Sequence, residues 1–244
     1  MHFNNSLDST VVPLQMVKNT WIKYLGIVIV IVCCFSLQSF NLGKPNPKNE
    51  PVIANIYLAE KLHINTNAFV LAVKGYEKLK QMGKITNLRY LTIADMSMAS
   101  SHPRLYIIDM DKQQVLLQTF VSHGKNSGLL FAEAFSNLVG SFKSSLGFYI
   151  TGKPYQGKHG TSLVLKGVEM GINDKAEERA IVLHGAAYAN QGFVKQQGYL
   201  GRSLGCPAVP SNQVKEIIQA IQGASCLFVY APNKQYLQQS ELIN

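Results

Sequence analysis

The chain has 244 residues, of which 47% are hydrophobic and 15% are charged, a composition that is ordinary for a globular protein and excludes wholesale disorder. Its formal net charge of +9 suits an anionic partner such as a membrane surface or an acidic polymer. Because no run of lysine and arginine is interleaved with aromatic residues, we expect no nucleic-acid partner. The four cysteines are too few for a disulfide framework, although a single disulfide between Cys206 and Cys226 is left open.

The N-terminal region contains an uncharged, β-branched run over residues 24–40. Lys18 and Lys23 precede it, as the positive region of an export signal precedes its apolar core. Residues 1–23 are then the cytoplasmic n-region, and 24–40 a cleaved signal or an uncleaved anchor in the cytoplasmic membrane; a buried strand or core helix is the alternative. Three prolines mark residues 41–51 as an exposed linker. We therefore expect the rest of the chain to be periplasmic or otherwise extracytoplasmic.

Residues 52–88 are predicted to form a helical flank, because apolar residues recur at helical spacing on both sides of a break near Asn65. From residue 89 the pattern changes to short strands, which we place at residues 90–95, 104–109, 114–121, 148–151, 162–165, 180–183 and 226–230. The second and third are predicted to form a hairpin, and one short helix is expected over residues 214–221. Few helices separate the strands, so residues 89–244 are predicted to be a β-rich domain of the α+β class, an antiparallel sandwich or barrel.

Three histidines are each followed by glycine: His123-Gly124, His159-Gly160 and His184-Gly185. Each pair stands at a predicted strand end or in a glycine-rich loop, where functional side chains are often displayed on a rigid scaffold. For any single pair, a surface histidine or a hydrogen-bonded structural histidine is the alternative. His184 is the sharpest candidate, because it directly follows the buried-looking strand 180–183 and its ring should emerge at a cleft.

The segment Gly201-Arg202-Ser203-Leu204-Gly205-Cys206-Pro207 is the second feature that suggests chemistry. Its two glycines allow backbone conformations closed to other residues, so the loop could present the sulfur of Cys206 to a cleft, with N–H groups nearby for an oxyanion. A cysteine nucleophile reacts as its thiolate, which a nearby histidine or cation favours; His184 and Arg202 are the candidates. The alternative is a buried filler, which is the interpretation we favour for Cys226 in its apolar strand.

Together these motifs resemble the signature of the L,D-transpeptidases, the YkuD-like enzymes of bacterial walls. The closer resemblance is to a divergent branch, the murein L,D-transpeptidase catalytic domain, and it covers about residues 65–231. It is carried by residues 157–163, 182–188 and 201–208. Two residues depart from the commoner motif: Leu204 replaces a second histidine and Ala208 replaces an arginine, whose charge we expect Arg202 to supply.

The resemblance implies a cysteine acyltransferase or peptidase that acts on peptidoglycan stem peptides and needs neither a metal nor an organic cofactor. Cys206 would attack a tetrapeptide stem and form a thioester, and His184 would serve as the base. Transfer of the thioester to a second amine would make the chain an L,D-transpeptidase, whereas transfer to water would make it an L,D-carboxypeptidase or endopeptidase. The implied catalytic set is Cys206, His184, Gly185, Ser203 and Gly205, and the implied substrate-binding set is Arg202, His159, Gly160, Tyr188 and His123.

Two further alternatives stay open on the sequence alone. A zinc hydrolase could use the histidines of the His-Gly pairs with Cys206 as a further ligand, although no HExxH or CxxC spacing is present. A wall-binding module could keep the fold without turnover, although it would have no need of Cys206 and His184. The sequence makes no prediction of the oligomeric state.

Overall fold

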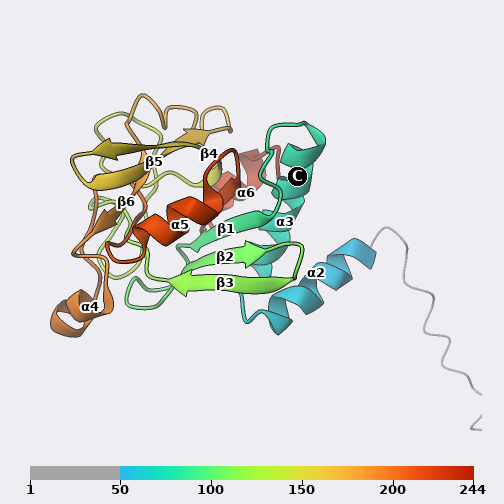
Figure 1. Cartoon of the computed structure of the whole chain (residues 1–244). Helices are drawn as coiled ribbons and strands as arrows, with labels where there is room; N and C mark the ends of the chain where they lie inside the picture. The colour runs from blue at the N-terminus through green and yellow to red at the C-terminus, as the bar shows by residue number, and fades with distance from the viewer. Residues whose placement is uncertain (1–49) are drawn as a thin grey trace, which may run out of the picture. The chain divides into compact units, whose positions relative to one another are not determined.

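The computed structural model describes residues 50–244, so the predicted n-region, signal or anchor and nearly all of the linker lie outside the described residues (Figure 1). The described helices are α2 (Glu50–Lys61), α3 (Thr66–Gln81), α4 (Gln191–Gln197), α5 (Val214–Ile221) and α6 (Lys234–Gln239). The strands are β1 (Tyr90–Asp95), β2 (Leu105–Asp109), β3 (Gln114–Thr119), β4 (Gly147–Gly157), β5 (Gly160–Gly167), β6 (Val182–Ala186), β7 (Ala208–Pro210) and β8 (Cys226–Tyr230). Across residues 50–244, every helix is too short or too polar to cross a membrane.

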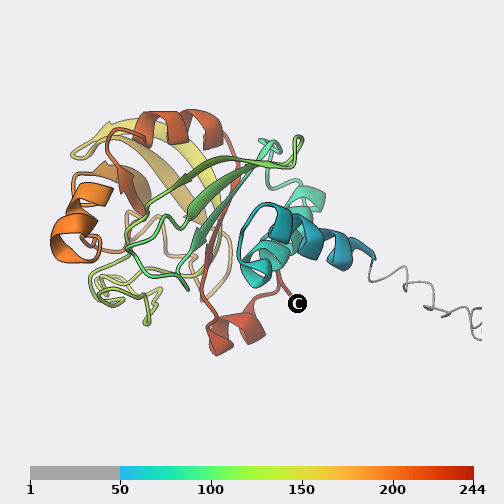
Figure 2. The same ribbon diagram turned by 90° about the horizontal axis from the view of Figure 1, so that it is seen from below.

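The eight strands form one sheet in the order β3-β2-β1-β8-β4-β5-β6-β7, which curls toward a barrel (Figure 2). Its two edges approach each other, since Ser122, just after β3, makes an isolated bridge to Ala208 in β7. The predicted β-rich, mostly antiparallel class is confirmed. Two neighbouring pairs, β1 with β8 and β6 with β7, are nevertheless parallel. The last strand thus enters the middle of the sheet, a long-range pairing that local patterns do not reveal.

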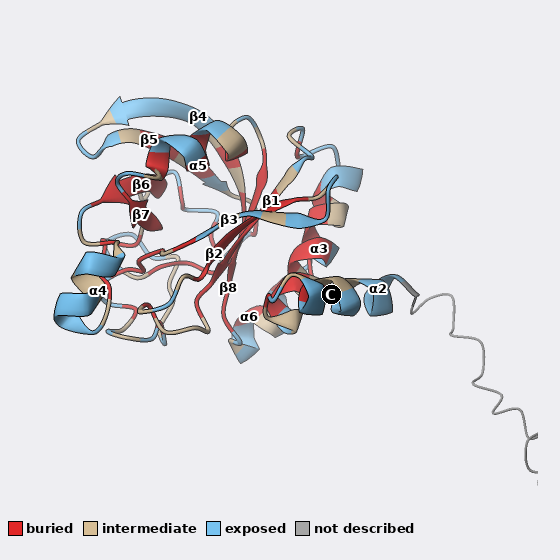
Figure 3. Ribbon diagram, turned by 60° about the horizontal axis from the view of Figure 1, so that its bottom comes forward, coloured by how far each residue is buried: buried red, intermediate tan, exposed pale blue. Residues whose placement is uncertain are grey.

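The helical flank divides where the sequence breaks, because Asn65 caps α3 by accepting hydrogen bonds from the backbone N–H groups of Asn67 and Ala68 at 3.0 and 3.3 Å. One face of α3 is buried and packs on β1 and β8. Gly75 on that face leaves room for the ring of Phe148 from β4, which would lie only 2.1 Å from a Cβ at position 75. Figure 3 shows the consequence, with the inner face of α3 buried and α2 largely exposed.

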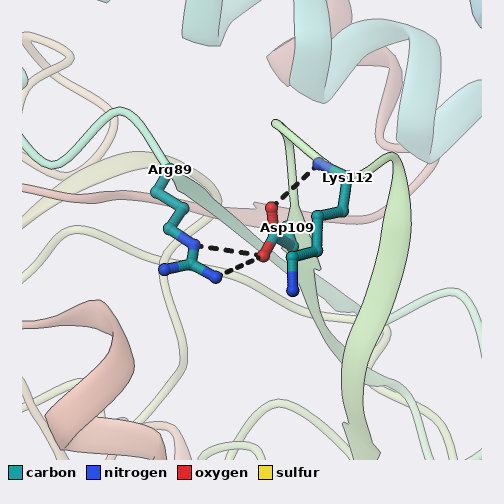
Figure 4. Close-up of polar contacts among 3 residues, drawn as sticks. All are labelled: Arg89, Asp109 and Lys112. Atoms are coloured by element: carbon teal, nitrogen blue, oxygen red, sulfur yellow. Dashed lines mark hydrogen bonds and ion pairs between the residues drawn. The ribbon is translucent and has the colours of Figure 1, made fainter.

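The predicted hairpin between β2 and β3 is present and is tied at its turn by Asp109 (Figure 4). One carboxylate oxygen of Asp109 accepts from Arg89 Nε and Nη2 at 3.1 and 2.9 Å, and the other accepts from the backbone N–H of Lys112 at 3.0 Å. The buried carboxylate of Asp109 therefore joins the start of β1 to the hairpin turn.

Two strand boundaries differ from the prediction in ways that position the site. The strand expected at residues 180–183 instead spans Val182–Ala186, so His184 lies inside β6 and not after it. Strands β4 and β5 are longer than predicted and pair as far as Gly157 with Gly160, which places His159 at the tip of a hairpin. Glycine at those two positions masked the end of each strand in the sequence pattern.

Candidate active site

Strand β6, the tip of the β4–β5 hairpin and the loop before β7 meet at one cleft of about 420 Å³. Five of the residues predicted for the site line this cleft together: His159, His184, Arg202, Ser203 and Cys206. Tyr188, also predicted, lines it as well. The cleft is completed by residues that were not in the predicted catalytic and substrate-binding sets: Tyr155, Lys158, Ser162, Arg179, Ala180, Val182 and Leu204.

The imidazole of His184 is held in one orientation by the strand that carries it. His184 pairs with Ser162 of β5 on one side and Ala208 of β7 on the other. Its ring Nδ1 lies 3.0 Å from the carbonyl oxygen of Gly185, a member of the implied catalytic set. Because a carbonyl only accepts, Nδ1 carries the proton and Nε2 is the basic nitrogen. Nε2 makes no hydrogen bond within residues 50–244, so it is left to the cleft.

The environment of His184 favours its neutral form. Burial lowers the pKa of the ring, and the neighbouring His159 and Lys158 lower it further, against the opposing effect of the hydrogen bond to Gly185. The ring of His159 stacks on that of His184, with centroids 4.4 Å apart and planes 23° apart. A neutral imidazole with one free nitrogen is suited to accept a proton near pH 7.

The turn that carries Cys206 is closed by Ser203. The Ser203 hydroxyl accepts from the backbone N–H of Gly205 at 3.0 Å and donates to the carbonyl oxygen of Cys206 at 2.6 Å. Gly205 has a φ of +125°, and a Cβ there would lie 2.9 Å from the carbonyl oxygen of Lys143. Glycine is therefore required at this position. Because the Gly205 N–H is engaged by Ser203, it is not free to bind an oxyanion as the sequence suggested.

The thiol of Cys206 is free and half-buried, and so no disulfide joins it to Cys226, which is buried in β8 as a filler. Its hydrogen bond in this structure goes to the carbonyl oxygen of Ala180, 3.7 Å from Sγ, and not to His184. Ala180 has a φ of +51°, an uncommon conformation for a residue with a side chain.

The charge state of Cys206 is set by opposing effects. Burial raises the pKa of the thiol, whereas the backbone N–H of Val182 and the positive charges of Arg179 and Lys158 lower it. Arg202, the cation expected from the sequence, is exposed, and its Nη1 donates to the carbonyl oxygens of Lys125 and Gly128 at 3.3 and 3.4 Å. Arg179 is therefore the arginine beside the thiol, and no local sequence motif predicted its position there.

Two glycines and Tyr188 have structural roles. Gly160 has a φ of +77° at the hairpin turn and does not line the cleft, so its part in the site is to shape the turn that carries His159. Gly201 donates its N–H to the carbonyl oxygen of Tyr188 at 2.9 Å, and a Cβ at Gly201 would lie 2.4 Å from Tyr188 Cβ. The chain reaches this contact through α4, a short helix that the sequence pattern did not predict.

His123 is not a cleft residue, which corrects its expected place among the substrate-binding residues. It is fully buried, its Nδ1 accepts from Arg104 Nη2 at 2.7 Å, and its Nε2 donates to the carbonyl oxygen of Gly128 at 3.2 Å. Burial and the Arg104 charge lower the pKa of His123 to about 4. Its backbone carbonyl accepts from Ser203 N–H at 3.0 Å, so His123 supports the Cys206 loop from beneath.

In the described part of the chain, no three His, Cys, Asp or Glu side chains gather in a way that could hold a metal ion. The groups that do gather are a thiol, a neutral imidazole and several cations, which are the groups of cysteine acyl-transfer chemistry. A family model described as the L,D-transpeptidase catalytic domain matches residues 60–230. The chain therefore belongs to the L,D-transpeptidase catalytic domain family.

Solved structures similar to this chain include the L,D-transpeptidase from Mycobacterium smegmatis, at 14% identity and a TM-score of 0.37, covering 59% of each chain. They also include the helical cell shape determining protein Pgp2 from Campylobacter jejuni, at 14% identity and a TM-score of 0.34, covering 66% of this chain and 56% of that one. The L,D-transpeptidase from Xylanimonas cellulosilytica matches at 10% identity and a TM-score of 0.32, over 74% of this chain and 93% of that one. The chain thus spans about 59% of the length of the first of these relatives. No curated protein matches the chain.

Proposed function

We propose that this protein is a peptidoglycan L,D-transpeptidase in which Cys206 is the nucleophile and His184 the general base. The observation that carries the proposal is the cleft itself, where the only described thiol outside the core faces the same space as an imidazole with a free Nε2. Membership of the L,D-transpeptidase catalytic domain family supplies the reaction class. The Cys206 thiol, which donates to the Ala180 carbonyl in this structure, must turn toward His184 before reaction.

The first half-reaction forms a thioester on Cys206. His184 Nε2 takes the thiol proton, and the thiolate attacks the carbonyl carbon of the third residue of a tetrapeptide stem. The C–N bond to the terminal D-alanine breaks as His184 returns the proton to the leaving amine. The carbonyl of Gly185 keeps the ring in the required tautomer, a role that a carboxylate fills in other triads.

The second half-reaction frees the thiolate. An amine from another stem attacks the thioester carbonyl, the C–S bond breaks, and the proton lost by the amine passes to His184. The product is a cross-link between two stems. Water in place of the amine gives trimming, which is the carboxypeptidase or endopeptidase outcome. The backbone N–H of Cys206 is the donor we assign to the oxyanion, because Ser203 already engages that of Gly205.

The charge of the cleft supports a stem peptide as the donor. Lys158, Arg179 and Arg202 line it, and none of its lining residues is Asp or Glu. Stem peptides carry free carboxylates, which cationic side chains bind by charge-assisted hydrogen bonds. The exposed positions of Lys158, His159 and Arg202 at the rim suit them to contact a flexible peptide.

We also propose that the N-terminal region delivers the domain to the cell envelope, as the apolar run 24–40 after two lysines indicates. A reporter enzyme that is active only in the periplasm, joined after residue 50, should be active. Stable but silent fusion protein would refute export.

The test of the reaction is to incubate the purified full chain with purified wall tetrapeptides and to read the products by mass spectrometry. We expect cross-linked dimers and released D-alanine, both absent with Cys206→Ala. Release of D-alanine without dimers would replace transfer by hydrolysis. Peptide binding with no release at all would instead support a non-catalytic wall-binding module.

A further inference from the structure

Arg179 is a cleft side chain whose hydrogen bonds within the protein play no part in the reaction above. It lies just before β6, is half-buried, and joins residues from a different part of the chain. Its Nη1 donates to the carbonyl oxygen of Ser136 at 2.8 Å and to the hydroxyl of Ser145. Its Nη2 donates to the carbonyl oxygen of Lys143 at 2.5 Å and to the Ser141 hydroxyl at 3.4 Å. One guanidinium thus fastens the segment 136–145 to the start of β6.

This fastened segment lies directly against the turn that carries Cys206. A Cβ at Gly205 would lie 2.9 Å from the Lys143 carbonyl oxygen and 3.1 Å from Arg179 Nη2. Gly205 therefore packs on the Lys143 carbonyl and on the Arg179 guanidinium, the two groups that this hydrogen bond joins. The hydroxyl of Ser144, in the same segment, also donates to the carbonyl oxygen of Gly205 at 3.3 Å. Moving Arg179 would remove the surface on which the Gly205-Cys206 turn rests.

The charge of Arg179 has no acidic partner among the ion pairs of residues 50–244. Its hydrogen bonds go to neutral oxygens, which accept the N–H groups without cancelling the charge. Burial lowers the pKa of Arg179, but a guanidinium stays protonated in proteins. The carbonyl oxygen of the next residue, Ala180, accepts a hydrogen bond from the Cys206 thiol. Ala180 thus binds the protonated thiol, and Arg179 presents a positive charge to the thiolate.

We propose that Arg179 is a positioning residue for Cys206, which holds the turn at Gly205 in place and favours the thiolate through its unpaired positive charge. The proposal rests on the function proposed above. It transfers to Arg179 the part that the sequence suggested for Arg202, whose guanidinium is directed to the carbonyls of Lys125 and Gly128. A purely structural arginine would need the same hydrogen bonds but would leave the ionisation of Cys206 unchanged.

The test is the pH dependence of Cys206 alkylation by iodoacetamide in the full chain, from about pH 5 to 10, a range that spans thiol ionisation. Peptide mass spectrometry separates Cys206 from the other three cysteines. This readout needs no peptide substrate, so it stands even if the proposed reaction fails. The other titratable groups of the cleft are Tyr155, Lys158, His159, His184 and Arg202, with Tyr188 and the nearby Tyr149, whose pKa values burial raises.

Arg179→Gln should move the alkylation midpoint to higher pH and slow alkylation at pH 7 about tenfold, because a nearby opposite charge favours the thiolate. Arg179→Lys keeps the charge and should keep the midpoint, while it loses turnover because one amine cannot reach four oxygens. Arg202→Gln removes a cation of the same cleft and should barely move the midpoint. Arg89→Gln, an arginine at the distant β2–β3 hairpin, is the matched control for the loss of one positive charge.

An unmoved midpoint in folded Arg179→Gln would overturn the proposal, and so would equal shifts in Arg179→Gln and Arg202→Gln. If Arg179→Gln does not fold, Arg179→Lys decides alone. A wild-type midpoint with reduced turnover supports the proposal. A raised midpoint, or turnover equal to that of the wild type, contradicts it. If Cys206 of the wild type is alkylated as expected but neither the wild type nor any variant turns over the stem peptide, the result counts against the proposed reaction and not against the role of Arg179.

Discussion

His123-Gly124 and His184-Gly185 look alike in the sequence and behave differently in the structure. Both rings are buried, with exposed fractions of 0% and 3%, and burial lowers the pKa of each. The difference lies in their ring nitrogens. Both nitrogens of His123 are bonded to protein, one by Arg104 and one by Gly128. Only Nδ1 of His184 is engaged, so Nε2 is open to the cleft.

Burial and a lowered pKa therefore do not by themselves make a histidine a base. A base needs one nitrogen that the protein leaves without a donor, at a place where a substrate can arrive. His184 meets this condition because its side chain lines the cleft and only its Nδ1 is engaged. His123 lies where the two sheet edges approach each other, and there it serves the fold.

The largest effect should come from the thiols, which repeat the contrast between cleft and core. Cys206→Ala should reduce stem-peptide turnover to background, because no other described thiol reaches the cleft. Cys226→Ala should keep most of the activity, since its sulfur only fills the core of β8. Steady-state kinetics of both variants check this. Substantial turnover in Cys206→Ala would show that Cys206 is not the nucleophile.

The second effect is the difference in kcat between substitutions of His184 and His123. His184→Gln should lower kcat about 10²- to 10⁴-fold at neutral pH, the usual worth of a general base. His123→Gln should lower it far less, by loosening the loop that its carbonyl supports. The measurement is kcat for both variants at equal folded concentration. Equal losses would show that the free nitrogen of His184 is not what distinguishes the two sites.

The third effect concerns stability, where we expect substitution of His123 to have the large effect and substitution of a cleft histidine the small one. His123→Phe leaves the buried Arg104 Nη2 without its acceptor, which should cost about 2 kcal/mol of unfolding free energy. His159→Ala, an exposed residue at the hairpin tip, should change stability by less than about 0.5 kcal/mol. Urea unfolding of the full chain measures both. A His123→Phe protein as stable as the wild type would remove the structural role of His123.

The fourth effect is a pH dependence of stability that comes from His123. Its pKa is about 4 in the folded chain, against the ordinary value of 6.5, so between these values the unfolded chain binds the extra proton. Stability should therefore fall as the pH drops from about 6.5 to 4, by at most about 1.4 kcal/mol per pH unit. Buried Asp95 and Glu169, whose pKa values are raised, act in the opposite sense.

This pH dependence is read as a difference between two proteins, which removes the contribution of the carboxyls. The unfolding free energy of wild type minus that of His123→Phe should decrease on acidification through this window. A difference that stays constant with pH would mean that His123 is not held neutral by its burial.

The sequence predicted the elements whose side chains follow a local period. The hairpin β2–β3, the helix α5 and the buried strand β8 are where alternation or helical spacing placed them. The parallel pairing of β8 with β1 was not predictable, because it joins segments far apart in the chain and is decided by packing. The bounds of β6 were missed because Gly185 extends the strand without adding to its apolar pattern.

The site was predictable to the same extent. Cys206 and His184 are marked by neighbouring glycines, whose backbone freedom the local sequence displays. Arg179 carries no such mark, since its partners lie in the remote segment 136–145 and its neighbours form an ordinary polar stretch. His123 was misplaced because a His-Gly pair does not reveal that a buried arginine will occupy its ring.

In the proposed reaction, Cys206 carries the acyl group and His184 serves as its base. The most direct measurement is the intact mass of the full chain after brief incubation with a tetrapeptide donor, followed by peptide mapping of the adduct. We expect a mass gain equal to the donor without its terminal D-alanine, located on Cys206 and absent in Cys206→Ala. An adduct on another residue, or turnover of the donor that persists in Cys206→Ala, would contradict it.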